Sequence, residues 1–344
     1  MLSTLPVGTM DANWQSCLHL YLQSILDHSG SIATYTVYRS TLARFFAFIG
    51  DTPPDQVKHR DVLAFQQLSS TSPRNRGKEV TASTKNQRRA ILSSFYHFAS
   101  SYELPDGTPL FTGILPTAGM HSLKPEVSIL SMSEDDLKRF FAAIPTNTLK
   151  GLRDRALYFL YFLTSRRRSE LCFLRWRDIE ATIIIDDDGS RHEGHLYRYR
   201  GKGASREVRA KELPESGWLA LTHYLEQAGR LVTMQPDDFL FVSVHPGQGR
   251  QSFEPAPLHK AYITREFKRY AALAGLDPRY SLHTLRHSSA RFRWTMGSPL
   301  QDIQHALNHS SIATTDIYIK RLAGVSDKGS RLLEQRFSHL LTDL

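Results

Sequence analysis

The sequence predicts a mainly α-helical protein of two domains, the second of which also contains a small antiparallel sheet. Its 344 residues exceed what a single hydrophobic core comfortably organises. Apolar residues recur at helical spacing in two blocks, and a segment rich in Pro and Gly separates these blocks. The hydrophobic fraction of 41% is sufficient for folded domains.

The first block, residues 14–102, contains about four predicted helices. The second of these is the clearest, because an apolar stripe runs along it and Gly50 follows as a helix-ending residue. The stripe consists of Tyr35, Tyr38, Leu42, Phe45, Phe46 and Ile49. In the fourth predicted helix, basic first turns precede a second apolar stripe, which consists of Ile91, Leu92, Phe95, Phe98 and Tyr102.

The second block begins after residues 104–125, "LPDGTPLFTGILPTAGMHSLKP", which we interpret as the domain boundary. At Ser133, "SEDDLKRFFAAI" opens with a Ser cap and three acidic residues in the first helical turn. Helices are also predicted in "LRDRALYFLYFLT" and from about Ser169. Then "TIIID", "HLYRYR" and "REVRA" read as strands of one small sheet, with "GKGAS" as a hairpin turn. From Pro214 onward the pattern is mostly helical.

The charge balance favours a polyanionic partner. Lys and Arg total 43 against 34 Asp and Glu, which gives a net charge of +9 at pH 7 and indicates nucleic acid. Cys17 and Cys172 lie far apart in the sequence, which argues against a disulfide framework and a structural zinc site. The longest apolar run, residues 156–163, is far shorter than the ~20 residues of a membrane span, and no signal segment opens the chain. We therefore expect a cytoplasmic protein without a membrane partner.

The second block contains several residues whose side chains are suited to phosphate chemistry. "HTLRH" places His283 and Arg286 three residues apart, on one face of a predicted helix. His309 and Tyr318 follow downstream, and Lys202 occupies the tip of the predicted hairpin. Upstream, "LTSRRRSEL" has three adjacent arginines at the start of a helix. Each feature alone is ordinary, so the prediction of function depends on their combination and order.

This combination resembles the tyrosine recombinase (integrase) family over the whole chain. The matching motifs are "SRRRSELCFLRWRDIE", "RGKG", "HTLRH" and "LNHSSIATTDIY". The resemblance implies a four-helix, SAM-like core-binding domain at residues 11–103, a linker at 104–130, a mixed α/β catalytic domain at 131–325 and a tail helix at 326–344. The first predicted helix begins within the opening residues, so a simple recombinase without a further arm-binding domain is expected.

The resemblance also implies a set of catalytic residues. These are Arg167, Lys202, His283, Arg286, His309 and Tyr318. The family pattern T-G-x-R-x-S-E-L favours Arg167 as the upstream catalytic arginine, then Arg168 and last Arg166, with the flanking arginines facing phosphate or solvent. Three residues depart from the family pattern: Ser165 and Asn308 stand at glycine positions, and Lys320 stands where His is common. The departures at Asn308 and Lys320 could change the mobility of the tyrosine segment.

The chemistry of these residue types fits DNA strand exchange. Two guanidiniums can hold the non-bridging oxygens of a phosphodiester with forked donors that keep their charge. A tyrosine phenol attacks and later leaves better than a serine hydroxyl, and the phosphotyrosyl bond conserves the energy needed for rejoining. A lysine can protonate the leaving 5′ oxygen, and histidines can accept the phenolic proton. No metal, ATP or other cofactor is expected.

The expected partners are double-stranded DNA target sites and further copies of the chain. A C-shaped clamp would hold the duplex mainly through salt-dependent phosphate contacts. By resemblance, the DNA-facing residues of the first domain are Arg39, Arg44, Lys85, Arg88 and Arg89, on faces opposite the apolar stripes. A tetramer would act on two sites, and a nucleoid-associated location follows from DNA binding. The tail carries an apolar stripe for docking on a neighbouring protomer or on its own domain: Leu332, Leu333, Phe337, Leu340 and Leu341.

Two alternatives share the same scaffold. A type IB topoisomerase uses a similar Arg, Lys, His and Tyr set to relax supercoils. The compact first domain and the motif sequences "HTLRH" and "LNHSS" favour a recombinase. A catalytically silent DNA-binding protein is disfavoured because no catalytic position is lost. Integration, excision, dimer resolution and transposition use one active site, so these residues fit all four roles equally.

Overall fold

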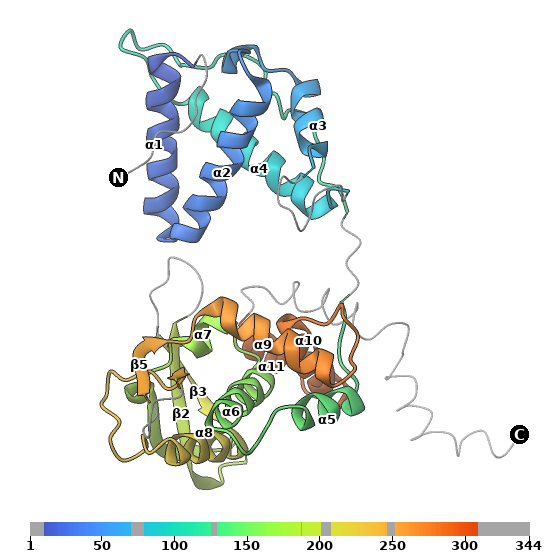
Figure 1. Cartoon of the computed structure of the whole chain (residues 1–344). Coiled ribbons are helices and arrows are strands. Elements are labelled where there is room, and N and C mark those ends of the chain that lie inside the picture. Colours follow the sequence, from blue (N-terminus) through green and yellow to red (C-terminus); the bar gives the residue numbers. More distant parts are fainter. Residues whose placement is uncertain are drawn as a thin grey trace, which may run out of the picture. The chain divides into compact units, whose positions relative to one another are not determined.

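The computed structural model describes residues 10–69, 79–124, 129–186, 188–200, 208–245 and 252–308. The chain divides into two compact units, one that takes the chain up to residue 127 and a larger one that begins at residue 128 (Figure 1). No helix within these described ranges is long and apolar enough to cross a membrane.

The first unit is a bundle of helices, as the periodicity predicts. Its α-helices are α1 (Ala12–Ser29), α2 (Ile32–Ile49), α3 (His59–Gln67) and α4 (Ala82–Ser100), and the 3-10 turn η1 (Pro54–Gln56) precedes α3. The Asp11 carboxylate caps α1 by accepting from the backbone N–H of Trp14 at 3.0 Å. Gly50 follows α2 with a φ of 58°, a backbone conformation that favours glycine. The predicted end of this helix is confirmed.

Aromatic side chains fill the core of the first unit. Phe46 of α2 and Phe95 of α4 meet edge to face, with ring centroids 5.6 Å apart. Residues 104–124 form no helix or strand, yet Phe111 from this segment is buried in the same core. The amide of Asn86 on α4 also pairs with both backbone groups of Leu123, at 2.8 and 2.9 Å. The Pro/Gly-rich segment therefore packs on the first unit, and the domain limits at 103 and 131 stay a prediction.

The second unit combines helices with two small sheets. Its helices are α5 (Glu134–Ala142), α6 (Leu149–Thr164), α7 (Arg168–Cys172), η2 (Trp176–Asp178), α8 (Glu215–Gln227), α9 (Lys260–Leu273), α10 (Leu282–Thr295) and α11 (Leu300–Leu307). Its strands are β1 (Ile179–Ile185), β2 (Arg191–Arg200), β3 (Val208–Leu213), β4 (Val242–His245) and β5 (Ser252–Pro257). The first three strands form an antiparallel sheet in the order β1-β2-β3, as predicted.

The pair β4–β5 was not predicted. The sequence indicates one sheet, whereas the structure adds this two-stranded antiparallel sheet. The four residues of β4 are too few to display an alternating pattern, and β5 contains Pro255 and Pro257, which argue against a strand in sequence-based reasoning. Short strands with prolines are stabilised here by the surrounding unit, and their local sequence does not reveal them.

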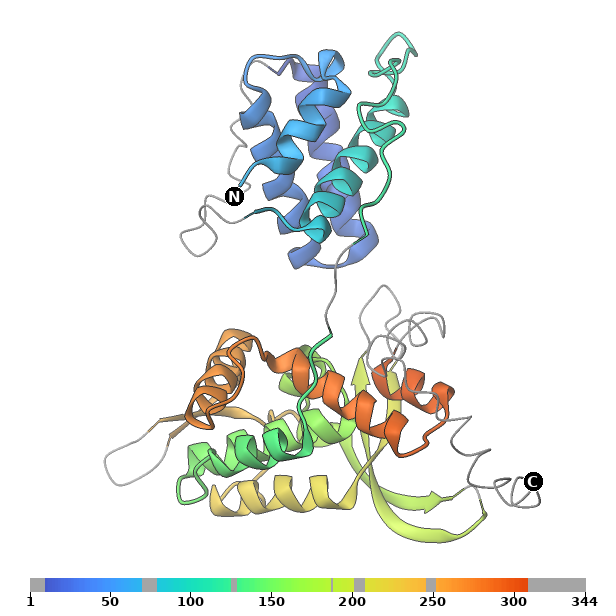
Figure 2. The same ribbon diagram turned by 90° about the vertical axis from the view of Figure 1, so that its right-hand side faces the viewer.

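The core of the second unit is built around α6. The Ser133 hydroxyl caps α5 by accepting from the backbone N–H of Asp136 at 3.0 Å, as the acidic first turn predicts. The apolar run of α6 is buried, and α6 packs against α8 and α10, while α10 packs against α11 (Figures 1 and 2). The end of α6 thereby lies close to α10 and α11, the helices that bear several of the candidate catalytic motifs.

A buried ionic network ties the start of α6 to α9. Lys150 on α6 donates to Glu266 on α9 at 2.7 Å and to Asp154 at 3.3 Å. Asp154 is fully buried, and it also accepts from the Tyr270 hydroxyl at 2.9 Å. Burial acts to raise the pKa of the Glu266 carboxyl, but the hydrogen bonds from Lys150 and Arg269 outweigh it and bring the pKa down to about 2. The folded state therefore favours the ionised carboxylate.

We predict that Glu266→Gln lowers the free energy of unfolding at pH 7 by about 2–3 kcal/mol, because a depressed carboxyl pKa is a stability contribution. A carboxyl whose pKa falls on folding stabilises the protein above its unfolded pKa, so the difference from wild type should shrink as the pH falls from about 4.5 towards 2. Urea titrations across this pH range measure it. Asp135→Asn, which breaks an exposed ion pair with Arg139, is the control and should change stability little.

Candidate active site at the end of helix α11

The carbonyl groups at the end of α11 receive hydrogen bonds from arginines of distant segments. The last turn of any helix leaves carbonyls without helical partners and carries partial negative charge. Arg166 donates to the carbonyls of His305, at 3.1 Å, and Ala306. Arg286 donates to the carbonyl of Leu307. With Arg167, three guanidiniums surround this one helix end.

Arg167 completes the group. Its Nη2 lies 3.4 Å from the carbonyl oxygen of Asn308, the residue that caps α11. Its Nη1 pairs with Glu170 at 3.1 Å, and the Glu170 carboxylate also accepts from the backbone N–H of Arg167 at 2.8 Å. The side chain of Arg167 is 30% exposed, so it lies between the buried carboxylate and solvent. Arg167 is thus oriented by two fixed acceptors.

Two non-glycine residues with positive φ make this convergence possible. Within the described ranges these are Ser165, with a φ of 53°, and Asn308, with a φ of 49°. Both stand where the resemblance leads one to expect glycine. Asn accepts this conformation readily, whereas Ser adopts it at a cost of about 1–2 kcal/mol. The Ser165 hydroxyl lies 2.7 Å from that of Ser289 on α10, and the Ser165 carbonyl accepts from Arg286, so tertiary contacts hold the turn.

Arg166 does not face phosphate or solvent, as the sequence led us to expect. Its side chain is 1% exposed and its guanidinium lies 4.3 Å from the ring centroid of Tyr199 on β2. Besides its bonds to α11 it donates to the Thr164 carbonyl at 3.2 Å. That expectation is wrong because the left-handed turn at Ser165 directs residue 166 into the core. Arg168 points elsewhere and donates to the carbonyl of Lys260 at 3.1 Å.

His283 lies within the electrostatic reach of the same cluster. It is the second residue of α10, one helical turn before the buried Arg286. Partial desolvation lowers the pKa of the His283 imidazole, and three guanidiniums lower it further. They belong to Arg286, Arg168 and Arg167. Because the pKa is lowered from an ordinary value near 6.5, the imidazole is neutral at pH 7 and can accept a proton.

Of the six sequence-predicted catalytic residues, three lie within the residues that the structure describes, and these three are near one another. Arg167 and Arg286 meet at the end of α11, and His283 lies near enough for their charges to lower its pKa. Lys202, His309 and Tyr318 lie outside the described residues, as does the predicted tail helix. Among the residues that the structure describes, no group of three or more His, Cys, Asp or Glu side chains is arranged to hold a metal ion.

Two family descriptions match the chain. The Phage integrase family matches residues 131–323, which is more than half of the chain. This protein belongs to the phage integrase family. The N-terminal SAM-like domain of phage integrases matches residues 23–106. The predicted resemblance and the predicted fold class, a SAM-like helical domain followed by a mixed domain with a small antiparallel sheet, are confirmed.

Curated relatives and solved structures agree with this assignment. Tyrosine recombinase XerD of Ralstonia nicotianae is 28% identical over 317 residues, covering 91% of each chain. XerD of Listeria monocytogenes is 27% identical over 303 residues, covering 86% of this chain and 90% of the relative. XerH bound to a palindromic difH substrate superposes with a TM-score of 0.65 at 17% identity, covering 97% of this chain and 90% of XerH. A lambda integrase dimer bound to a COC′ core site gives 0.62 at 18%, covering 91% and 97%.

The structure also separates the DNA-contact candidates of the first unit. Arg88 was expected on an exposed face, but it is 5% exposed and donates from Nη1 to the carbonyls of Phe65, Gln66 and Leu68 at 2.7–3.0 Å. That expectation is wrong, because Arg88 caps the end of α3. Arg89 is half-buried and donates to the Met120 carbonyl at 2.6 Å.

The other three candidates remain partly exposed to solvent. Arg39, Arg44 and Lys85 are half-buried. Arg44 donates to the Ser69 carbonyl at 3.3 Å. Lys85, whose side chain is 12% exposed, lies 3.9 Å from the exposed carboxylate of Glu79, a long ion pair.

One contact at the site was missed by sequence reasoning. Arg209 on β3 donates to the side-chain oxygen of Asn308. This bond joins β3, which follows Lys202 in the sequence, to the residue that precedes His309. Only the unusual Asn at a glycine position hinted at it, because an Asn in a left-handed turn offers a side-chain acceptor that Gly lacks.

We predict that Arg166→Leu lowers the free energy of unfolding by about 3 kcal/mol, because the carbonyls of Thr164 and Ala306 lose their guanidinium donor and the buried packing on Tyr199 is lost. Arg167→Lys is the matched control one residue later, and it should cost about 1 kcal/mol or less, because a cation still faces the buried Glu170 carboxylate and the Arg167 side chain is 30% exposed. Urea unfolding of both variants measures the contrast. Equal losses, or a larger loss for the Arg167 variant, would contradict the division of roles described above.

Proposed function

We propose that this protein is a site-specific DNA recombinase that cuts and rejoins strands through a covalent 3′-phosphotyrosyl bond on Tyr318. The observation that carries the proposal is the meeting of Arg167 and Arg286 at the end of α11, with His283 within reach of their charges, in a chain of the phage integrase family. The names of the relatives, tyrosine recombinases XerD and XerC, support the same activity.

The arginines supply the phosphate site. Each guanidinium has five N–H donors in a fixed plane, so the bonds of Arg286 and Arg167 to protein carbonyls orient the whole fork. We propose that the scissile phosphate binds to these two guanidiniums. Donors oriented before the substrate arrives stabilise charge that develops on the non-bridging oxygens without further reorganisation.

The remaining candidates supply the nucleophile and transfer protons. The Tyr318 oxygen forms a bond to phosphorus, and the bond from phosphorus to the 5′ oxygen breaks. Neutral His283, assisted by His309, accepts the phenolic proton, and Lys202 gives a proton to the leaving 5′ oxygen. The reverse steps, with a 5′ hydroxyl from another strand as nucleophile, rejoin the DNA. The number of phosphoester bonds stays constant, so the scheme needs no ATP. Guanidinium donors stabilise the charge on the phosphate in this scheme, so it assigns no step to a metal.

DNA binding by the first unit is part of the proposal. We assign phosphate contacts to Arg39, Arg44 and Lys85, while Arg88 is excluded by its burial and Arg89 is occupied by its bonds to residues 120 and 122. Affinity from such contacts should fall steeply with salt.

We further propose domain limits at residues 11–103 and 131–325, a tetramer acting on two sites, and a cytoplasmic, nucleoid-associated location.

We predict that Tyr318→Phe binds its DNA site with wild-type affinity and forms no covalent complex, because Phe keeps the ring and lacks the nucleophilic oxygen. A nicked suicide substrate that traps the covalent intermediate, resolved on a denaturing gel, provides the measurement, and sequencing the trapped DNA would identify the target site.

Arg167→Ala in the same assay should slow cleavage at least ~10²-fold, the scale expected for the loss of a transition-state donor.

Cleavage that persists in the Tyr318 variant would refute the assignment. Arg168→Ala is the control for the arginine triplet, and a larger loss there than at Arg167 would move the catalytic role by one residue. Resolution of a four-way junction by the wild-type protein separates recombination from relaxation of supercoils.

A tail that docks on a neighbouring protomer would couple the sites of the proposed tetramer. We predict that deletion of residues 330–344 leaves binding to a single site nearly unchanged and abolishes recombination between two sites, because the apolar tail stripe needs a groove on another copy. Gel-shift titration and a two-site recombination assay measure these effects. Full recombination by the truncated chain would contradict docking in trans, and loss of folded protein would assign the tail to its own domain.

A further inference from the structure

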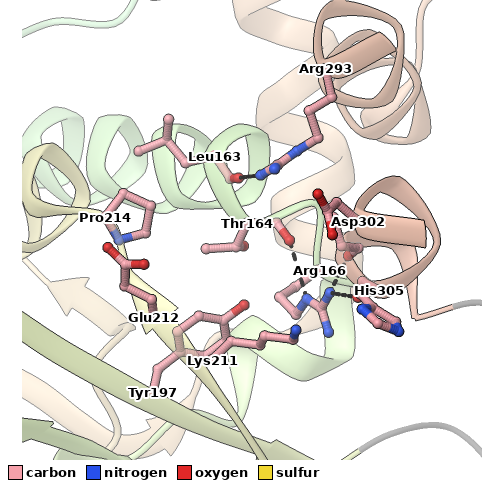
Figure 3. A pocket seen from close by; sticks show the side chains of 11 residues that line it. Leu163, Thr164, Arg166, Tyr197, Lys211, Glu212, Pro214, Arg293, Asp302 and His305 are labelled. Carbon is pink, nitrogen blue, oxygen red and sulfur yellow. Dashed lines mark hydrogen bonds between the residues drawn. The ribbon is translucent and has the colours of Figure 1, made fainter. Parts of the chain in front are cut away.

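A hydrogen bond joins strand β3 to the end of α11 beside a cavity. The cavity has a volume of about 320 Å³, and its lining includes Lys211 of β3 and His305 of α11 (Figure 3). Two residues before Lys211 in the strand, Arg209 donates from Nη1 to the side-chain oxygen of Asn308, which follows the last residue of α11. The bond therefore connects the strand to the helix end next to a place where a cavity separates other residues of the two elements.

Asn308 is held from three sides. Its backbone N–H donates to the His305 carbonyl at 3.2 Å, and its own carbonyl oxygen lies 3.4 Å from Nη2 of Arg167. Its side-chain oxygen accepts from Arg209. Both Asn and Gly adopt a φ of 49° readily, but of these two only Asn offers a side-chain acceptor. Asn308 therefore connects Arg167, a proposed phosphate ligand, with Arg209.

The register of the sheet places Arg209 on the face that holds the buried arginine. Arg209 of β3 stands opposite Tyr199 of β2, so the two side chains lie on one face of the sheet. Tyr199 is buried there, with the Arg166 guanidinium 4.3 Å from its ring centroid. Arg209 itself is exposed. Its contribution at this face is therefore the hydrogen bond to the helix end, since an exposed side chain does not fill the core.

We propose that Arg209 and Asn308 are a pair of positioning residues for the strand-cleavage reaction proposed above, on which this inference rests. Arg209 fixes the Asn308 side chain, and Asn308 in turn fixes the Arg167 guanidinium and the peptide group that leads to His309. An amide suits this position because it accepts from a guanidinium without bringing a negative charge near the proposed phosphate. Groups that are held in place before DNA binds need less reorganisation when charge develops.

Single-turnover cleavage at saturating DNA tests the pair, on a nicked suicide substrate that carries the site identified from DNA trapped by the wild type. Asn308→Gly keeps the left-handed backbone and removes only the acceptor, and Arg209→Met removes the donor. Each should slow cleavage about tenfold, with DNA affinity in a gel shift nearly unchanged. The double variant should be no slower than either single variant, because both changes break the same bond. Lys211→Met removes a neighbouring cation from the same face of β3, so this matched control should cleave like the wild type.

Asn308→Asp separates positioning from a purely structural role. With Arg209 present, the carboxylate has a cationic partner, so this variant should cleave faster than Asn308→Gly. In the Arg209→Met background the order of the two should reverse, because an unpaired carboxylate repels the phosphate. A residue that served only to permit the left-handed turn would show no such reversal. Unfolding midpoints verify that each variant is folded.

Three results would overturn the inference while the proposed function stands. They are full-rate cleavage by the Asn308→Gly variant, additive losses in the double variant, and an Arg209→Met variant that loses DNA affinity but cleaves normally at saturation. Failure of the proposed function is a different result, in which the wild type forms no covalent complex or Tyr318→Phe still forms one. The inference then falls with it.

Discussion

The second unit depends on one interaction, the binding of arginine side chains to the carbonyl end of α11. Carbonyls in the last turn of a helix carry partial negative charge and attract cations. Only part of this turn is satisfied by the backbone, where the Asn308 N–H donates to the His305 carbonyl at 3.2 Å. Arg166 donates to two of these carbonyls from the core, and Arg286 and Arg167 donate to the next two. Guanidiniums that would repel each other are thereby held together. The same arrangement orients the donors that we assign to the scissile phosphate.

Many arginines of this basic chain serve backbone carbonyls, and this changes how its net charge is interpreted. Arg88 caps α3, Arg153 binds the Val242 carbonyl at 2.8 Å from within a buried ion pair, and Arg166 caps α11. All three are at most 5% exposed. The excess of basic residues favours a nucleic-acid partner, but the net charge overstates the number of cations that remain available to bind one. Each buried arginine ties together segments that lie far apart in the sequence.

Chain order and spacing predict the reaction, whereas packing separates residues that the sequence pattern leaves equivalent. The order of Arg, Lys, His-x-x-Arg, His and Tyr identifies the family, because its chemistry requires those side chains. Three consecutive arginines, however, are equivalent in a one-dimensional pattern. Their roles diverge at Ser165, whose left-handed backbone turns Arg166 inward and leaves Arg167 at the edge. The bond between Ser165 and Ser289 that fixes this turn joins residues 124 positions apart.

The sequence by itself determined the helices of the first unit, the β1-β2-β3 sheet, the family and most of the candidate catalytic residues. These features depend on local periodicity, capping residues and motif order, all of which are readable along the chain. Only the tertiary structure decided the burial of Arg88 and Arg166, the β4–β5 pair, the link from Arg209 to Asn308 and the cavity beside β3. Each of these depends on contacts between distant segments, and the free energy of such contacts is not encoded in any short stretch of sequence.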